Sequence, residues 1–286
     1  MAQAISPSNA PARFVASDFI PVAAPTSAPT TVPAVIRSTA PASNPAAATA
    51  PATPTVCTAP VAFSHLARPL THLMRSLASN EPVTIVAIGS SSTAGAGASS
   101  RDASYPSRLA VELRQRFSGR DITVINRGMN GEETDNMMAR FAADVFPAHP
   151  QLILWQVGTN SVLRDRPLDR HAEQLYRGID QLKASGADVV LIDLQYSPAV
   201  VAKSETPDMV AQIALAAKNE NVDLFQRFAA MRDWSEVQHL PFDTFVAPDK
   251  LHMNDWGYAC MAKLLANGIA EAVNRPIASV AAQRPH

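Results

Sequence analysis

The sequence predicts a three-layer α/β/α sandwich in which helices cover both faces of a central, mostly parallel five-stranded sheet. Short apolar runs alternate along the chain with longer segments whose apolar residues recur at helical spacing. This alternation is typical of parallel sheets, because two parallel strands need a crossover segment between them. The strand-like runs are apolar almost throughout, which favours burial on both faces. The chain has 286 residues and no visible internal repeat, so we expect one domain, from residue 61 to 275.

Five runs have the length and composition of strands. The first reads Val-Thr-Ile-Val-Ala-Ile and ends at Gly89, so that a β-branched apolar run is followed directly by a loop signal. The last of the five is short. The predicted strands are 83–88, 122–126, 152–157, 189–194 and 222–225.

Six segments predict helices. In the first of them Leu66, Leu70, Leu73 and Leu77 follow helical spacing. The fourth is followed by Gly186, a residue type that commonly ends helices. The predicted helices are 62–77, 106–117, 134–145, 169–184, 207–218 and 256–274.

Residues 1–60 differ in composition from the rest of the chain. They hold 11 of its 23 prolines, together with much Ala, Thr and Ser, and such a segment offers little apolar bulk to bury. We expect a disordered or extended linker here, and a flexible tail at 276–286. The first residues lack the basic start and apolar core of a signal peptide. A Pro/Ala/Thr-rich segment nevertheless suits an exported protein whose signal has been removed, so export to the periplasm or cell envelope is favoured over a cytoplasmic location.

Charge, hydropathy and cysteine content exclude several classes of protein. The formal net charge is −1, which gives no electrostatic footprint for nucleic acid. No apolar run reaches the roughly 18 residues of a membrane span. The two cysteines, Cys57 and Cys260, form no C-x-x-C pair, which argues against a structural zinc site. They can form a disulfide if the protein is exported, or be two ordinary small apolar residues.

Small and polar residues follow the predicted strands where ligands bind in open α/β sheets. Ser90, Ser91 and Ser92 follow the first strand, and a Gly- and Asn-containing loop at 126–134 follows the second. A serine at such an edge can be a nucleophile if a histidine base reaches it. Any of the three serines fits that description, and each also fits a turn or helix cap.

These loops resemble the conserved blocks of the SGNH/GDSL hydrolase family, in the expected order. The first block, a Gly-Asp-Ser-type turn, reads Gly89-Ser90-Ser91 here. The second contributes a glycine, for which Gly131 is the best match. The third, Gly-x-Asn-Asp-like, reads Gly158-Thr159-Asn160, and the last, Asp-x-x-His, is matched by Asp249 and His252.

The resemblance covers most of residues 81–265 and implies a flavodoxin-like fold with a serine hydrolase site. Ser91 is then the nucleophile, His252 its base and later an acid, and Asp249 the residue that orients the imidazole. The oxyanion donors are the backbone N–H groups of Ser91 and Gly131 and the side-chain amide of Asn160. No metal or organic cofactor is required.

Two positions depart from the family pattern. Ser90 stands where an acidic residue usually precedes the nucleophile, and Ser161 stands where one usually follows the asparagine of the third block. Neither belongs to the triad, so we expect activity to survive. Tyr196 and Trp256 are further candidates for lining the substrate cleft, with core packing as the alternative.

The sequence therefore predicts a serine esterase that acts on a small-molecule or carbohydrate ester. Few long apolar insertions separate the blocks, which favours a short acyl group, such as an O-acetyl group on envelope carbohydrate. Two alternatives stay open: an O-acyltransferase that uses the same site with a sugar hydroxyl as acceptor, and a non-catalytic protein that binds envelope glycan.

Overall fold

The computed structural model describes residues 56–275. A five-stranded sheet lies at its centre, with strand order β2-β1-β3-β4-β5 and parallel pairing throughout. The predicted sheet is therefore confirmed, and β2 and β5 form its edges. The strands are β1 (Val83–Gly89), β2 (Ile122–Gly128), β3 (Leu152–Gln156), β4 (Asp188–Ile192) and β5 (Asp223–Phe225).

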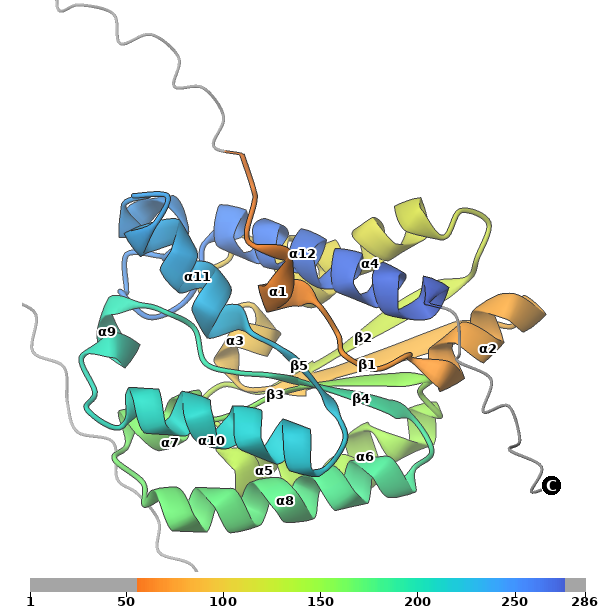
Figure 1. The fold of residues 1–286 in the computed structure, drawn as a ribbon, viewed down its shortest axis with the longest axis horizontal. Coiled ribbons are helices and arrows are strands. Elements are labelled where there is room, and N and C mark those ends of the chain that lie inside the picture. The colour runs from red at the N-terminus through yellow and green to blue at the C-terminus, as the bar shows by residue number, and fades with distance from the viewer. Residues whose placement is uncertain (1–55, 276–286) are drawn as a thin grey trace, which may run out of the picture. The chain divides into compact units, whose positions relative to one another are not determined.

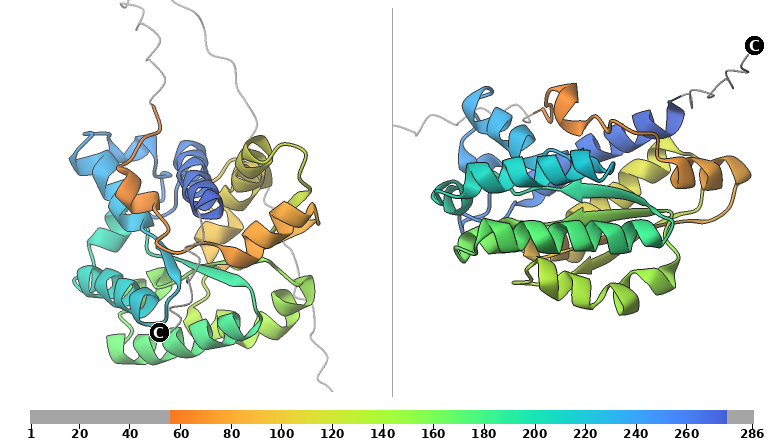
Figure 2. Two further views of the ribbon diagram at one scale, coloured as in Figure 1. Left: turned by 45° about the vertical axis from the view of Figure 1, so that its right-hand side comes forward. Right: turned by 60° about the horizontal axis from the view of Figure 1, so that its bottom comes forward.

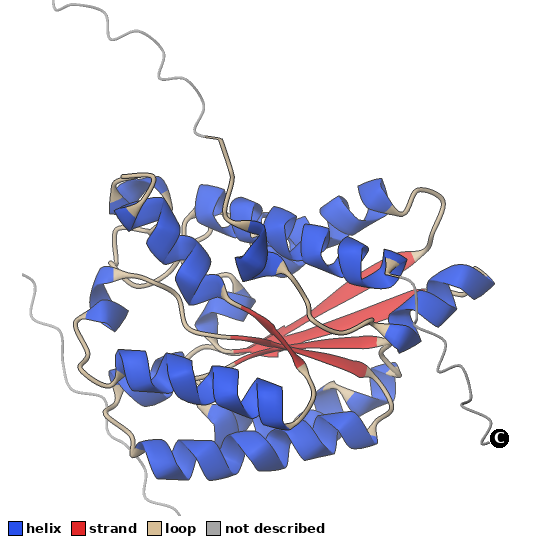
Figure 3. Ribbon diagram, viewed as in Figure 1, coloured by secondary structure: helices blue, strands red, loops and turns tan. Residues whose placement is uncertain are grey.

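Helices cover both faces of this sheet, as the ribbon in Figure 1 and its colouring by secondary structure in Figure 3 show. The turned views of Figure 2 show the same two helical layers. One layer contains α1 (Val61–Ser64), α2 (Thr71–Ser79), α4 (Tyr105–Arg116), α11 (Arg227–Glu236) and α12 (Asp255–Asn274). The other contains α5 (Thr134–Ala139), α6 (Phe141–Asp144), α8 (Leu168–Ala184) and α10 (Thr206–Asn219).

The two helical layers explain why the strands are apolar almost throughout. In β1, Ile85 and Ala87 point into the core beneath α4 and α12, whereas Val86 and Ile88 point into the core beneath α5 and α8. Successive side chains of a strand point to opposite faces. A central strand with a helical layer on each side therefore needs apolar residues on both of its faces.

Two of the predicted helices are wrong as single elements. The segment predicted at 62–77 forms α1 and α2, with a non-helical stretch between them that contains Pro69. Proline lacks the N–H of a helical hydrogen bond and disfavours helical geometry at the residue before it. The segment predicted at 134–145 is divided at Arg140, whose φ of −112° and ψ of 6° interrupt the helix between α5 and α6.

Three short helices lie in the connections that follow strands and were not predicted. They are α3 (Ser91–Ala94) after β1, α7 (Thr159–Leu163) after β3 and α9 (Pro198–Val201) after β4. The longer α11 was also missed, because its buried face includes Arg227 and Asp233 and so hides the apolar periodicity.

A disulfide joins Cys57 to Cys260, with 5.4 Å between their Cα atoms. It ties the chain before α1 to α12. Among the described residues, no helix is long and apolar enough to cross a membrane. The predicted linker at 1–60 lies outside the described residues except for 56–60, and so does the predicted tail at 276–286.

Candidate active site

The candidate residues come from loops at the carboxyl ends of the strands. Ser91 is the first residue of α3 after β1, and Asn160 lies in α7 after β3. Gly131 lies in the loop between β2 and α5. Asp249 and His252 lie in the loop before α12. Because all strands of the sheet are parallel, these loops meet at one edge although they are far apart in sequence.

Ser91, His252 and Asp249 form a continuous hydrogen-bonded chain. The Oγ of Ser91 lies 2.7 Å from Nε2 of His252, and Nδ1 of the same ring lies 2.6 Å from Oδ2 of Asp249. An ionised carboxylate can only accept hydrogen bonds, so Nδ1 of a neutral imidazole carries the proton. Nε2 is then the acceptor that faces the serine hydroxyl, which is the arrangement a general base requires.

The Asp249 carboxylate also shapes the loop that carries the histidine. Its Oδ1 accepts hydrogen bonds from the backbone N–H groups of Leu251 and His252, each at 2.9 Å. Partial burial by itself would raise the pKa of Asp249, but the bonds from the His252 ring and from the two N–H groups outweigh it and hold this pKa below its usual value. The Asp249 carboxyl group in contact with the imidazole is therefore ionised.

The structure separates Ser91 from its two serine neighbours. Ser90 and Ser92 are each 1% exposed. The backbone N–H and hydroxyl of Ser90 both donate to Oε1 of Gln156, at 2.9 and 3.0 Å. Of the three serines, Ser91 is the one whose hydroxyl lies within hydrogen-bonding distance of the His252 ring, 2.7 Å from Nε2. Gln156 was missed in the sequence, although a glutamine at the end of an apolar strand is the signal that could have revealed it.

Two of the candidate oxyanion residues, Gly131 in its loop and Asn160 in α7, lie on segments that a hydrogen bond joins. Nδ2 of Asn160 donates to the backbone oxygen of Glu132 at 2.8 Å. A primary amide has two N–H groups, so this bond leaves one for another acceptor. Gly131 adopts a φ of +78°, a left-handed conformation that favours glycine. Its carbonyl oxygen accepts a bond from Arg164 at 2.8 Å.

A second glycine, Gly128, allows α3, the helix that begins at Ser91, to approach β2. A Cβ atom built on Gly128 would lie 2.0 Å from the backbone nitrogen of Ala94 in α3. No side chain fits in that space, so the close contact between α3 and the end of β2 depends on glycine. This contact brings the start of the Gly131 loop close to the helix that begins at Ser91.

Tyr196 and Trp256 lie in aromatic clusters. The ring of Tyr196 stacks on Phe242 with centroids 5.8 Å apart, and its hydroxyl donates to Glu236 at 2.7 Å. Trp256 packs edge-to-face against Trp234 with centroids 5.2 Å apart. Neither pair includes Ser91, His252 or Asp249, so a substrate contact by Tyr196 or Trp256 stays a prediction.

This geometry can support nucleophilic acyl transfer. It offers a hydroxyl beside an oriented imidazole, and N–H groups from neighbouring loops for the negative charge that develops on an attacked carbonyl oxygen.

Comparison with known proteins points to the same class of chemistry, acyl transfer. Residues 56–275 match the model of the non-GDSL lipase-like family. An arylesterase from Vibrio mimicus is 35% identical to this chain over 95 residues, which are 33% of this chain and 46%, about half, of the relative's length.

Solved structures of esterases share the fold. A two-domain esterase active on acetylated mannans has a TM-score of 0.65 and 18% identity, and the match covers 74% of this chain and 56% of that one. An acetylxylan esterase from Geobacillus stearothermophilus, solved as a catalytic mutant, has a TM-score of 0.55 and 17% identity over 67% and 94% of the two chains. A lipase/acylhydrolase from Enterococcus faecalis gives 0.54 and 22% over 66% and 95%.

Proposed function

Because this chain belongs to the non-GDSL lipase-like family, we propose that it is a serine esterase that hydrolyses carboxylic esters through an acyl-enzyme. The observation that carries the proposal is the unbroken chain of hydrogen bonds from Ser91 through His252 to Asp249.

Acylation begins when Nε2 of His252 accepts the proton of the Ser91 hydroxyl. The Ser91 oxygen forms a bond to the carbonyl carbon of the ester, and the electron pair of the C=O bond moves to the oxygen. The Asp249 carboxylate stabilises the imidazolium that results. When the tetrahedral intermediate collapses, the bond to the leaving alkoxide breaks, and His252 gives its proton to that oxygen.

Deacylation repeats these steps with water as the nucleophile. His252 accepts a proton from water, the hydroxide oxygen bonds to the acyl carbon, and the bond to Ser91 breaks with return of the proton to its oxygen. In both steps the carbonyl oxygen becomes negative. The N–H groups of Ser91 and Gly131 and the free N–H of the Asn160 amide are the proposed donors to that charge, and one such donor typically contributes roughly 2.7–4 kcal/mol.

The proposed substrates are short-acyl esters, with O-acetyl groups on carbohydrate favoured. Two of the proteins that share the fold are described as esterases of acetylated mannans and of acetylxylan. The disulfide between Cys57 and Cys260 adds support for an exported protein, because disulfides persist in oxidising compartments. An enzyme in such a compartment would meet envelope or extracellular carbohydrate.

The test is hydrolysis of p-nitrophenyl acetate, butyrate and octanoate by the wild type and by Ser91→Ala. We expect turnover that favours acetate and falls by at least about 10⁴-fold in Ser91→Ala, because the nucleophile is lost. Ser118→Ala, an exposed serine beyond α4, is the matched control and should keep full activity. Circular dichroism checks that all three proteins are folded.

Other outcomes would point elsewhere. Equal turnover by the wild type and Ser91→Ala would remove Ser91 as the nucleophile. Binding of acetylated glycan without turnover would favour a binding protein. An acyl-sugar product that forms faster than free acid when a sugar is added would favour an acyltransferase.

A further inference from the structure

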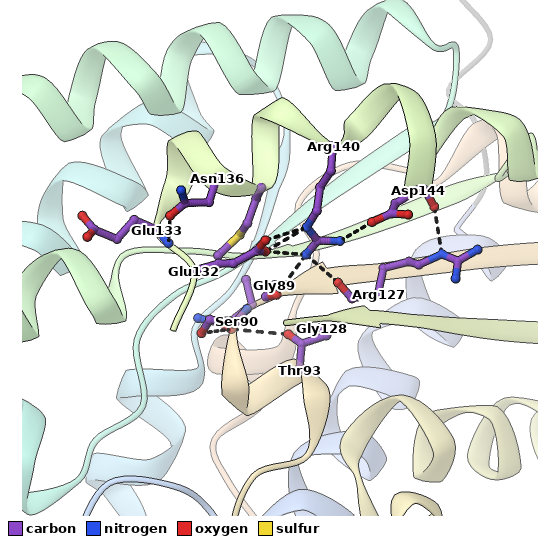
Figure 4. Close-up of polar contacts among 12 residues, drawn as sticks. Gly89, Ser90, Thr93, Arg127, Gly128, Glu132, Glu133, Asn136, Arg140 and Asp144 are labelled. Carbon is purple, nitrogen blue, oxygen red and sulfur yellow. Dashed lines mark hydrogen bonds and ion pairs between the residues drawn. The ribbon is translucent and has the colours of Figure 1, made fainter. Parts of the chain in front are cut away.

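The side chain of Arg140 lies at the junction of three segments that carry the proposed site. Arg140 occupies the break between α5 and α6, and its side chain is only 13% exposed. Figure 4 shows its guanidinium at the centre of a set of polar contacts. Those contacts reach the end of β1, the end of β2 and the loop that contains Gly131.

The first contact is a bidentate ion pair with the Glu132 carboxylate. Nε of Arg140 donates to both carboxylate oxygens, at 3.0 and 2.8 Å, and Nη2 donates to Oε2 at 2.6 Å. The Glu132 side chain is 14% exposed, so the pair is largely shielded from water. Nη1 makes a further bond to Asp144 at 2.9 Å.

The same guanidinium also binds backbone at the ends of two strands. Nη2 donates to the carbonyl oxygen of Arg127 in β2 at 2.7 Å and approaches that of Gly89 in β1 at 3.3 Å. Gly89 lies two residues before Ser91. The Gly89 oxygen also accepts a hydrogen bond from the N–H of Met129 at 3.0 Å. Arg140 therefore reinforces an existing link between β1 and the loop that follows β2.

Glu132 connects this cluster to the proposed oxyanion donors. It directly follows Gly131 in the chain, and its backbone oxygen accepts the bond from the Asn160 amide. The side chain of Glu132 is therefore held by Arg140, while its backbone holds Asn160. The proposed donors at Gly131 and Asn160 and the strand that leads to Ser91 are all linked to one guanidinium.

We propose that Arg140 is a positioning residue for the oxyanion-binding site, which it serves by fixing the Gly131–Glu132 loop to the ends of β1 and β2. The inference rests on the proposed esterase function. Electrostatics contributes as well: without Arg140, the shielded Glu132 carboxylate would lack its cation, in the residue directly after Gly131.

Arginine suits this role and lysine does not replace it. The guanidinium presents five donors in a rigid planar fork, which can hold a carboxylate and carbonyl oxygens at the same time. An ammonium group keeps the charge but lacks the fork. Arg140→Lys should therefore restore the electrostatic part and leave the loop less well fixed.

The experiment compares Arg140→Met and Arg140→Lys with the wild type in p-nitrophenyl acetate hydrolysis. For Arg140→Met we expect kcat to fall by about 100-fold with KM within about threefold of the wild type, since the proposed interaction acts in the transition state. Arg140→Lys should recover part of that loss. Affinity for phenylboronic acid, which forms a tetrahedral adduct on Ser91, should fall in parallel with kcat.

A control separates positioning from loss of stability. Arg116 also makes a partly buried ion pair, with Glu112 at 2.6 Å, on a helix that carries none of the proposed site residues. Arg116→Met should lower the melting temperature while kcat and boronate affinity stay at wild-type values.

A second variant tests the route through Glu132. Glu132→Gln keeps the shape of the side chain and removes its charge. The double variant combines Arg140→Met with Glu132→Gln. If Arg140 acts through Glu132, its fold-loss of kcat should be smaller than the product of the fold-losses of the two single variants.

The outcomes distinguish this inference from the proposed function. If wild-type turnover depends on Ser91 and Arg140→Met keeps wild-type kcat and boronate affinity, the positioning role is wrong and the esterase assignment stands. If Ser91→Ala turns over as fast as the wild type, the esterase assignment fails, and the positioning role fails with it.

Discussion

The proposed site has two halves that are built in different ways. The local half is the Asp249–His252 loop, in which acid and base are three residues apart and share hydrogen bonds within one turn. The assembled half comprises Ser91, Gly131 and Asn160, which come from the ends of three different strands. Contacts between loops, such as that of Asn160 with Glu132, hold the assembled half together.

This difference has a physical consequence. The local half depends on one short segment, because the same Asp249 carboxylate fixes both the loop and the ring. The assembled half depends on the whole sheet, since a shift of any one strand end would move one donor relative to the others. We therefore expect changes in the local half to act directly on the base, and changes in the assembled half to act on the oxyanion.

The largest effect among the following variants is expected in the local half. Asp249→Asn replaces an acceptor by a side chain that can donate to Nδ1 of His252 and so favour the wrong tautomer. Turnover of p-nitrophenyl acetate should fall by roughly 10³–10⁴-fold in kcat, measured over a range of substrate concentrations to separate kcat from KM.

Asp243→Asn is the control for that change, because Asp243 is exposed and contributes its backbone oxygen, not its carboxylate, to the bond with Asn254. It should behave as the wild type. Near-normal kcat in Asp249→Asn would mean that the local half does not orient the base.

A smaller loss is expected in the assembled half. Asn160→Ala removes one of the proposed donors, and kcat should fall by about 10²–10³-fold. Asn160→Asp keeps the shape but places a carboxylate where negative charge develops, so it should lose at least as much activity. Stopped assays of acetate release from an acetylated oligosaccharide would check both variants on a second substrate.

Asn219→Ala is the matched control for Asn160→Ala and should keep the wild-type kcat. Asn219 is an exposed asparagine on α10 whose side chain donates to the Tyr176 hydroxyl. If Asn160→Asp were as active as the wild type, the oxyanion role of Asn160 would have to be abandoned.

The two halves also differ in how far the sequence predicts them. Asp249 and His252 lie in one short motif, and the hydrogen bonds that join them are local. Ser91 was selected from three adjacent serines by family resemblance, and only the tertiary structure shows that Ser90 is turned toward Gln156. Physical pattern alone could not decide among them, because burial of each serine depends on strands far away in the sequence.

The contacts that support the assembled half could not be predicted from the sequence. Arg140 lies within a segment that predicts one continuous helix, and its role depends on the ends of β1 and β2. The central strands were predictable because burial on both faces makes them apolar at almost every position. The break at Pro69 and the polar face of α11 show where local pattern and tertiary packing disagree.

The smallest effect on catalysis is expected from the disulfide, which joins the chain before α1 to α12 and includes no residue of either half. Replacing both Cys57 and Cys260 by alanine should lower the free energy of unfolding by about 2–5 kcal/mol, because the cross-link closes a long loop. Alanine is preferred to serine because Cys260 is 2% exposed, and a buried hydroxyl would add its own cost.

Urea unfolding measures the stability of the double variant, and hydrolysis of p-nitrophenyl acetate measures its kcat, which should be unchanged at 25 °C. Wild type treated with reductant separates loss of the cross-link from loss of the sulfur atoms. A drop in kcat while the protein is still fully folded would show that the assembled half depends on a constraint at α12 as well as on the strand ends, and the division into two independent halves would then be wrong.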